Sequence, residues 1–463
     1  MHADTILHAR WIIPVGPSSR SHRLSMTDAP SGYGPRDHPH GLVLEDHSLV
    51  MADGLIAAIL PTAEARELVR STGARSIELP DHALLPGFVN AHTHVAMNLM
   101  RGVADDLPLM RWLRDHIWPL EGRFLADDFV HDGSLLACAE LIRGGVTCFN
   151  DMYFFPEATL RAAEAAGLRA SVGLPVIDFP TPWGSGPDEY ISKGLALRDE
   201  WHGHPRMSFM LAPHAPYTVG DEPLQRIRVL ADQLGIGVHM HVHETAHEVM
   251  EAERLTGERP LARLDRLGLL NEQFLAVHMT QLNDDEMALL RDRGVHIAHC
   301  PESNLKLASG IAPIARLKAL GVNVAIGTDG AASNNDLDLL GETRTAALLA
   351  KGVSGDASAV PAAEALYMAT LGGARALGLD ERIGSLEVGK AADVIAIDLN
   401  QIETQPLFDP IAQIIYAASR QQVTHSWVAG QMLMNERRLL TVYEDDLLAN
   451  AESWRARLVT PST

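Results

Sequence analysis

The stretch "GIGVHMHVHETAHE", residues 235–248, decides the fold predicted for this chain. Apolar residues at positions 238, 240 and 242 alternate with histidines at 239, 241 and 243, and a period of two is typical of a strand. Two glycines precede this alternation, and glycine weakens a helix. We therefore predict a strand that ends near Glu244, followed by a helix that carries His247.

This prediction bears on function because residues 243–247 match the HExxH pattern of zinc peptidases. In that pattern both histidines lie on one face of a helix, and the glutamate between them is the general base. A strand that ends near Glu244 would leave His243 outside the helix that carries His247. The sequence therefore disfavours a peptidase.

Seven other apolar runs alternate with segments of helical spacing, such as residues 221–235 and 283–294. Eight strand and helix units predict an α/β fold, a TIM (β/α)8 barrel, over residues 83–383. The predicted strands lie within residues 83–94, 145–151, 169–176, 207–218, 235–244, 274–282, 294–303 and 323–333.

Residues 1–82 and 384–463 carry short strand-like runs with turns between them, which predicts a small β domain built from both termini. The stretch from Gly16 to His40 is rich in Ser, Pro, Gly and Arg and has no periodicity. We predict that it is an exposed, functionally silent loop.

The composition excludes several classes of function. The formal charge of −21 disfavours binding to nucleic acid or to anionic membranes. No run of 18 apolar residues predicts a membrane span, and the start of the chain does not resemble a secretory signal. Three scattered cysteines are too few for a disulfide framework. We expect a cytoplasmic protein that acts on a small molecule.

Ionisable residues stand at the ends of six of the eight predicted strands. The active site of a TIM barrel is assembled at the carboxyl ends of its strands, so we expect these side chains to meet at one mouth. They are His92, His94, Asp151, His214, His241, Glu244, His278 and Asp329.

Four of these residues predict a metal site. His92 and His94 lie two apart on a strand, so their side chains project from the same face and can bind one ion. With His241 and Asp329 they form a set of three nitrogens and one oxygen, which suits zinc or another borderline divalent ion and leaves a position for water. The metal would lower the pKa of that water, and Asp329 would accept its proton.

Two more residues are candidates for proton transfer. His278 would hydrogen-bond the developing tetrahedral centre, and Glu244 would protonate a ring nitrogen and then the leaving group. Each residue also has a purely structural interpretation when it is taken alone. Asp329 stands in a turn-like motif, and His278 resembles a satisfied interior histidine. Their common position at strand ends favours the functional interpretation.

Longer motifs carry a family resemblance. "LLPGFVNAHTH", "HVHE", "AVHM", "GTDGAASNN" and "GSLEVGKAADVIAID" resemble the amidohydrolase superfamily. "RGVADDLPLMRWLRDHIWPLE", "APHAPYT" and "PESNLKLASGIAPI" are similar to its 5′-methylthioadenosine/S-adenosylhomocysteine deaminase branch. The resemblance covers nearly the whole chain outside residues 16–40. It implies a β-sandwich beside the barrel and a homo-oligomer.

The resemblance also implies a reaction, the hydrolytic deamination of 5′-methylthioadenosine, and by extension of S-adenosylhomocysteine or adenosine. It implies one zinc ion on His92, His94, His241 and Asp329, with Glu244 and His278 as the proton-handling residues. Substrate contacts would come from Glu121, which would bind ribose hydroxyls, and from His214. Trp112 would either stack on the ligand or pack in the core.

Residues 170–197 bear on the choice of substrate. Relatives that accept S-adenosylhomocysteine carry arginines after the third strand, and this segment has none. It offers Phe179, Pro180, Pro182 and Trp183 instead, which suits an apolar methylthio group. We therefore expect 5′-methylthioadenosine to be preferred over S-adenosylhomocysteine.

Two alternatives stay open at this point. The first is a related amidohydrolase that acts on guanine, 8-oxoguanine or a triazine, because the same metal centre would serve. The second is a catalytically silent barrel that only binds its ligand. A cytidine-type deaminase is disfavoured, because the PCxxC arrangement of those enzymes is absent from the sequence.

Overall fold

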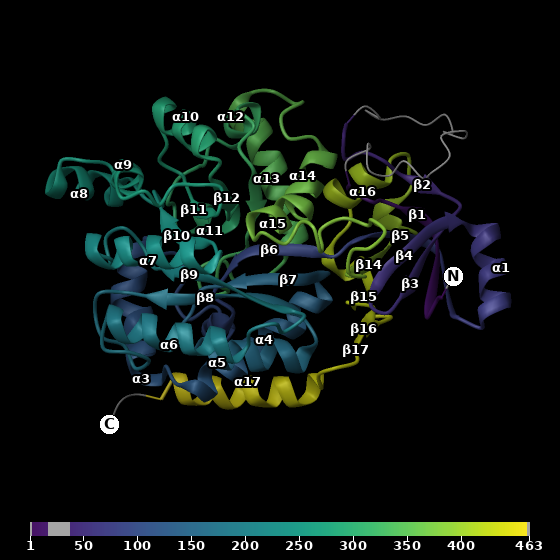
Figure 1. Ribbon diagram of the computed structural model, residues 1–463, viewed down its shortest axis with the longest axis horizontal. Helices are drawn as coiled ribbons and strands as arrows, with labels where there is room; N and C mark the ends of the chain where they lie inside the picture. The colour runs from purple at the N-terminus through teal and green to yellow at the C-terminus, as the bar shows by residue number, and fades with distance from the viewer. Residues whose placement is uncertain (1, 17–37, 461–463) are drawn as a thin grey trace.

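The computed structural model describes residues 2–16 and 38–460 (Figure 1). Most of the predicted loop between Gly16 and His40 therefore lies outside the described residues. None of the helices within the two described ranges has the length and apolar character needed to cross a membrane.

Eight parallel strands form the barrel and follow one another around it in chain order. A parallel bridge between Thr93 and Asp329 joins the two ends of this sheet, and the Asp329 amide donates to the carbonyl of His92 at 3.0 Å. The predicted TIM barrel is confirmed. Its strands are β6 (Phe88–Thr93), β7 (Val146–Asp151), β8 (Arg169–Val176), β9 (Met207–Pro213), β10 (Val238–Val242), β11 (Phe274–His278), β12 (His296–His299) and β13 (Val324–Ile326).

Burial explains why these segments become barrel strands. Every residue of β7, β8, β10 and β11 is buried, as expected for parallel strands covered on both faces. Helices cover the outside of the barrel (Figure 1). They are α4 (Asp127–Arg143), α5 (Pro156–Ala166), α6 (Pro187–Glu200), α7 (Asp221–Leu234), α8 (Ala246–Thr256), α9 (Pro260–Arg266), α10 (Asp284–Arg293), α11 (Pro301–Lys306), α12 (Ile314–Ala319), α13 (Leu339–Ser354), α14 (Ala362–Met368) and α15 (Leu371–Ala376).

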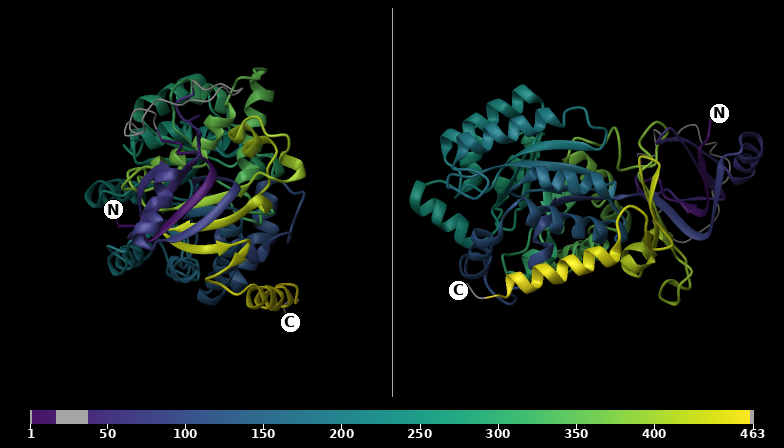
Figure 2. Two further views of the ribbon diagram at one scale, coloured as in Figure 1. Left: turned by 90° about the vertical axis from the view of Figure 1, so that its right-hand side faces the viewer. Right: turned by 90° about the horizontal axis from the view of Figure 1, so that it is seen from below.

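The two ends of the chain share a second, mostly antiparallel sheet of nine strands (Figure 2). Buried residues from strands far apart in this sheet, such as Ile56 and Trp427, belong to one apolar cluster, so the sheet curls around its own core. The boundaries at residues 82 and 384 stay predictions. The strands are β1 (Thr5–Ile12), β2 (Leu44–Glu45), β3 (His47–Ala52), β4 (Leu55–Pro61), β5 (Arg75–Pro86), β14 (Val394–Asp398), β15 (Val423–Val428), β16 (Gln431–Asn435) and β17 (Arg438–Leu439).

A chain of short helices follows β6 and covers one side of the barrel mouth. It consists of η1 (Val95–Met100), α2 (Leu109–Trp112), η2 (Leu113–Ile117) and α3 (Trp118–Phe124). The remaining helices belong to the two chain ends and are α1 (Thr62–Thr72), η3 (Ile402–Thr404), α16 (Pro410–Tyr416), η4 (Arg420–Gln422) and α17 (Glu444–Leu458).

Helix α17 leaves the second sheet and runs back along the barrel (Figure 2). Trp454 packs edge-on against Phe129 of α4, with 5.2 Å between the ring centroids. Its indole Nε1 donates to Asp132 at 2.8 Å. The last helix therefore binds the barrel, although its chain segment follows the strands of the second sheet.

A buried ion pair also joins the barrel to the second sheet. Arg169 begins β8, and Asp393 precedes β14. Nε of Arg169 donates to Oδ2 of Asp393 at 2.9 Å and Nη2 donates to Oδ1 at 3.1 Å, and the two side chains are 3% and 2% exposed. Burial acts to lower the pKa of Arg169, but the charge of Asp393 outweighs it and raises the pKa. Asp393 also accepts from the amide of Ala429 at 2.7 Å.

We predict that Arg169→Met lowers the free energy of unfolding by about 3–5 kcal/mol, because it leaves the Asp393 carboxylate buried without a partner. Asp393→Asn in the same chain removes that charge and should restore part of the loss. Urea denaturation of the full chain measures both effects. If Arg169→Met alone unfolded at the wild-type urea midpoint, the ion pair would not stabilise the fold.

Candidate active site

Three histidines and one aspartate meet at the mouth of the barrel. His92 lies in β6, His94 directly after it, His241 in β10 and Asp329 after β13. Nε2 of His92 lies 3.3 Å from Nε2 of His241 and 3.3 Å from Oδ1 of Asp329. Nε2 of His94 lies 3.2 Å from the same carboxylate oxygen. Ligand atoms of the three histidines all lie within 4.8 Å of one another, so one metal ion can contact them together.

The other ring nitrogens of these histidines are bound on the side away from the cluster. Nδ1 of His94 donates to the carbonyl of Met152 at 2.5 Å, and Nδ1 of His241 donates to the carbonyl of His214 at 2.8 Å. Nδ1 of His92 lies 2.9 Å from Nε2 of His239. Partners on Nδ1 orient the rings so that Nε2 faces the cluster, which is the usual arrangement around a metal.

The charges of the cluster fit a divalent cation. Burial acts to raise the pKa of Asp329, but hydrogen bonds to His92 and His94 hold it well below its usual value. Burial lowers the pKa of His241 well below its usual value. Burial also acts to lower the pKa of His94, but Asp329 outweighs it and raises the pKa to about 9. The carboxylate is therefore an anion that favours a positive charge on His94, and a divalent cation bound between the two would supply that charge in place of a proton.

Two serines orient the carboxylate of Asp329. The hydroxyls of Ser303 and Ser333 donate to its Oδ2 at 2.7 Å and 3.1 Å. Oδ1 faces the histidines and accepts from the amide of Gly330 at 2.9 Å. Sequence reasoning did not single out these serines, although both stand within motifs that carry the family resemblance.

Glu244 and His278 form a buried acid and base pair beside the cluster. Oε2 of Glu244 lies 3.9 Å from Nε2 of His278. Nδ1 of His278 donates to the amide oxygen of Asn304 at 2.9 Å, so its Nε2 is left to face the pocket. Burial raises the pKa of Glu244, and the hydroxyl of Ser309 lies 3.4 Å from its Oε1. Burial therefore favours the protonated form of Glu244, which is the form that acts as a general acid.

The HExxH segment is not a helix. Strand β10 ends at Val242, and α8 begins at Ala246, so His243 precedes the helix that carries His247. Nδ1 of His243 bonds to the carbonyl of Gln281 at 3.1 Å, and its Nε2 accepts from the amide of Leu261 at 3.3 Å. Both nitrogens of His243 are therefore occupied by the backbone. The predicted strand and the exclusion of a peptidase motif are confirmed.

The carboxylate of Glu248 holds the turn between β10 and α8. It accepts from the amide of His243 at 3.0 Å and from the amide of Glu244 at 2.8 Å. The backbone of His243 has a φ of +53°, a left-handed conformation that is strained for a residue with a side chain. Glu248 is 8% exposed and burial raises its pKa to about 7. It therefore fixes the position from which Glu244 enters the pocket.

A cavity of about 460 Å³ opens onto this cluster. The structure brings together the residues predicted for the metal, for proton transfer and for substrate contacts, because His92 belongs to the metal-ligand cluster and the others line the cavity. Those lining residues are His94, Trp112, Glu121, His214, His241, Glu244, His278 and Asp329. Asp151 instead lies beneath the mouth, where its Oδ1 accepts from the amide of Val95 at 2.8 Å and from the hydroxyl of Thr93 at 3.1 Å.

The outer walls of the cavity are apolar. Trp112 lines it and belongs at the same time to a buried apolar cluster, so both of its predicted roles fit the structure. Phe179, Pro180 and Pro182 also line the cavity, as the apolar-wall prediction requires. Trp183 does not line the cavity, so the prediction was wrong for this residue. It is 4% exposed, stacks on Tyr190 and turns its indole N–H toward Glu157, because the chain turns back on itself between residues 181 and 184.

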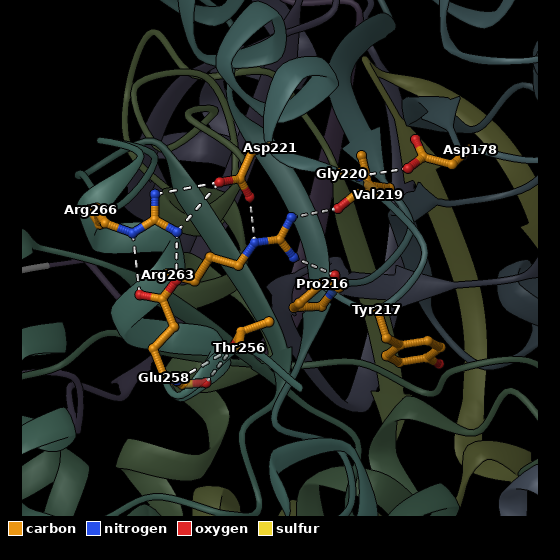
Figure 3. A pocket seen from close by; sticks show the side chains of 10 residues that line it. All are labelled: Asp178, Pro216, Tyr217, Val219, Gly220, Asp221, Thr256, Glu258, Arg263 and Arg266. Carbon is orange, nitrogen blue, oxygen red and sulfur yellow. Dashed lines mark hydrogen bonds and ion pairs between the residues drawn. The ribbon is translucent and has the colours of Figure 1, made fainter. Parts of the chain in front are cut away.

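A second cavity of about 410 Å³ lies nearby and shares Tyr217 with the first (Figure 3). Its charged groups bind one another. Arg263 of α9 donates to Asp221 at 2.7 Å and to the carbonyls of Pro216 and Val219 at 2.5 Å and 2.9 Å (Figure 3). Asp221 and Glu258 are paired with arginines, and Asp178 accepts from the amide of Gly220, so these charges bind the walls of the cavity to one another. Arg263 clamps the loop after β9, which carries Tyr217.

Comparisons with known proteins agree with this geometry. The family model described as "Amidohydrolase family" matches residues 83–433. A protein named 5-methylthioadenosine/S-adenosylhomocysteine deaminase from Teredinibacter turnerae is 47% identical over 455 residues, which is 98% of each chain. One of the same name from Saccharophagus degradans is 45% identical over 456 residues, covering 98% of this chain and 97% of the other.

Two solved structures extend the comparison. An adenosine deaminase from Xanthomonas campestris with bound zinc is 50% identical, with a TM-score of 0.91 over 98% of both chains. An atrazine chlorohydrolase from Arthrobacter aurescens with zinc has a TM-score of 0.86 over 97% of this chain and 99% of the other. The latter is 22% identical and therefore supports the fold alone.

We predict that Glu248→Gln lowers the free energy of unfolding by about 1–3 kcal/mol, because the amide nitrogen of glutamine would face one of the two backbone N–H groups. Glu251→Gln, on the exposed side of the same helix, serves as the matched control and should change stability little. Chemical denaturation measures both variants. Equal effects of the two substitutions would contradict the role of Glu248 in the turn.

Proposed function

The chain belongs to the amidohydrolase family, and from this premise we propose that it is a zinc-dependent deaminase of 5′-methylthioadenosine. The reaction replaces the 6-amino group of the purine by a carbonyl oxygen, consumes water and releases ammonia. The observation that carries the proposal is one cavity in which the metal-ligand cluster and the Glu244 and His278 pair lie under apolar walls. Relatives named for this activity over nearly the whole chain support it.

The proposed ligands of the ion are His92, His94, His241 and Asp329. A zinc ion bound there would supply a Lewis acid that activates water for attack on the purine ring. The carboxylate of Asp329 would accept the proton of that water at Oδ1, because Ser303 and Ser333 occupy Oδ2.

Glu244 would work on the purine itself. Burial raises its pKa and so favours the protonated form, which would donate its proton from Oε2 to a ring nitrogen. Glu244 would then take up the hydroxyl proton of the tetrahedral centre and pass it to the leaving amino group, and the proton held by Asp329 would restore Glu244. Nε2 of His278 would contact the oxygen at the reacting carbon, since Asn304 fixes the other side of the ring. His214 would contact the base from β9, and Glu121 would accept hydrogen bonds from the ribose hydroxyls.

We further propose that the chain acts as a homo-oligomer in the cytoplasm, as the family likeness implies. Its partner is a small nucleoside. The formal charge of −21 repels nucleic acid and anionic membranes, which are therefore not proposed as partners.

We predict that Glu244→Gln lowers kcat for 5′-methylthioadenosine by at least about 100-fold, because glutamine cannot deliver a proton to the ring. Ultraviolet absorbance of the zinc-loaded protein follows the conversion of the adenine to the hypoxanthine ring. Glu253→Gln, on α8 outside the pocket, is the control and should keep the wild-type rate. A wild-type protein that turns over guanine or an aminotriazine but no adenine nucleoside would contradict the proposed substrate class.

The lining of the cavity bears on which 5′ substituent of the nucleoside it accepts. None of the described residues that line the cavity is an arginine or a lysine, so the carboxylate of S-adenosylhomocysteine would lack a cation to bind. We expect kcat/KM for 5′-methylthioadenosine to exceed that for S-adenosylhomocysteine by about tenfold or more, the difference that one lost charge-assisted hydrogen bond produces.

Phe179→Arg tests the cause of this preference. Phe179 lines the cavity and is 44% exposed, so a guanidinium there can reach both the pocket and water. The variant should lower the ratio of kcat/KM for 5′-methylthioadenosine to kcat/KM for S-adenosylhomocysteine. A wild-type preference for S-adenosylhomocysteine would show that another group binds the amino-acid end.

A further inference from the structure

Tyr153 connects the barrel mouth to the helices that cover it. It stands two residues after the end of β7, lines the cavity and is 5% exposed. Its hydroxyl donates to Oε1 of Glu121 in α3 at 2.7 Å. Its ring lies 6.4 Å from the ring of His94, measured between centroids. The tyrosine therefore stands between the metal-ligand cluster and the carboxylate proposed to bind the ribose.

Glu121 depends on this hydrogen bond for its position. Among the described residues, Tyr153 is the only side chain that hydrogen-bonds to its carboxylate, and no arginine or lysine forms an ion pair with it. Burial raises the pKa of Glu121 to about 6, and the hydrogen bond from Tyr153 acts in the opposite direction. Without that bond the side chain would rotate more freely about its three torsions, because no other contact of this kind fixes it.

We propose that Tyr153 is a positioning residue that sets the selectivity of the enzyme for ribose over deoxyribose. By holding Oε1, it leaves Oε2 of Glu121 directed at the pocket, ready to accept from the hydroxyls of the sugar. The proposal rests on the proposed function, because it assumes that Glu121 receives a ribosyl substrate. Tyr153 acts through Glu121 and takes no part in proton transfer to the purine.

The geometry distinguishes this role from a purely structural one. A structural defect would slow all substrates alike, whereas a displaced Glu121 affects only a sugar that has hydroxyls to bind. The effect of removing the Tyr153 hydroxyl on KM would also vanish in a protein that lacks the Glu121 carboxylate. The effects of substituting two residues that act through one contact do not add.

The test compares Tyr153→Phe with the wild type, using the zinc-loaded full chain and 5′-methylthioadenosine with its 2′-deoxy and 2′,3′-dideoxy analogues, the last of which has no ribose hydroxyl to bind. For the ribosyl substrate we expect KM to rise about tenfold, with kcat within about twofold, as for the loss of one charged hydrogen bond. The ribose preference should fall by the same factor. In a Glu121→Ala background, Tyr153→Phe should change KM by less than twofold.

Tyr367→Phe is the matched control, because it removes a buried hydroxyl from α14, outside the cavity, and should leave KM unchanged. Equal losses on all three substrates, or additive effects with Glu121→Ala, would overturn the role of Tyr153. An unchanged Tyr153→Phe variant would overturn it as well. If the wild type deaminates none of the three nucleosides, the proposed function fails, and the inference fails with it.

Discussion

The closure of the barrel between its first and last strands is the constraint on which the site depends. The bridge from Thr93 to Asp329 places the aspartate opposite the two histidines that flank Thr93. The close approach of these strand ends crowds the positions that face His92 and His94. A Cβ on Gly327 would lie 2.9 Å from Cβ of His92, and one on Gly330 would lie 3.1 Å from Cβ of His94. The contact that assembles the cluster therefore excludes a side chain at position 327 unless His92 moves, and it leaves little space for one at position 330.

The residues proposed for chemistry also occupy strained backbone. His278 and Asp329 have φ angles of +74° and +61°, and His243, next to Glu244, has +53°. Such conformations cost about 1–3 kcal/mol each and persist only where the surroundings hold them. Here the surroundings are identifiable, since Glu248 binds the amides at one turn and the hydroxyl of Thr280 donates to the carbonyl of Glu244 at 2.7 Å. Buried polar contacts therefore fix the directions of the reactive side chains.

Local pattern in the sequence predicted the strands and the cluster, but the walls of the pocket were predicted only in part, and only with the help of the family resemblance. A period of two places His92 and His241 on the inner face, and the topology of a barrel then brings them together without further information. Glu121 could be placed only through the family resemblance, because a helix surface residue carries no sign of the distant strand that it faces. Tyr153 was missed and Trp183 was misplaced for a related reason, since the path of a loop after a strand is set by packing.

We propose that side chains from three strands of the closed barrel hold a single metal ion. Anomalous diffraction at the zinc absorption edge, from crystals of the zinc-loaded protein, would locate that ion. We expect one strong peak at the barrel mouth, within about 2.0–2.2 Å of Nε2 of His92, His94 and His241 and of the carboxylate of Asp329. A peak bound by His243 and His247, or none at the mouth, would contradict it.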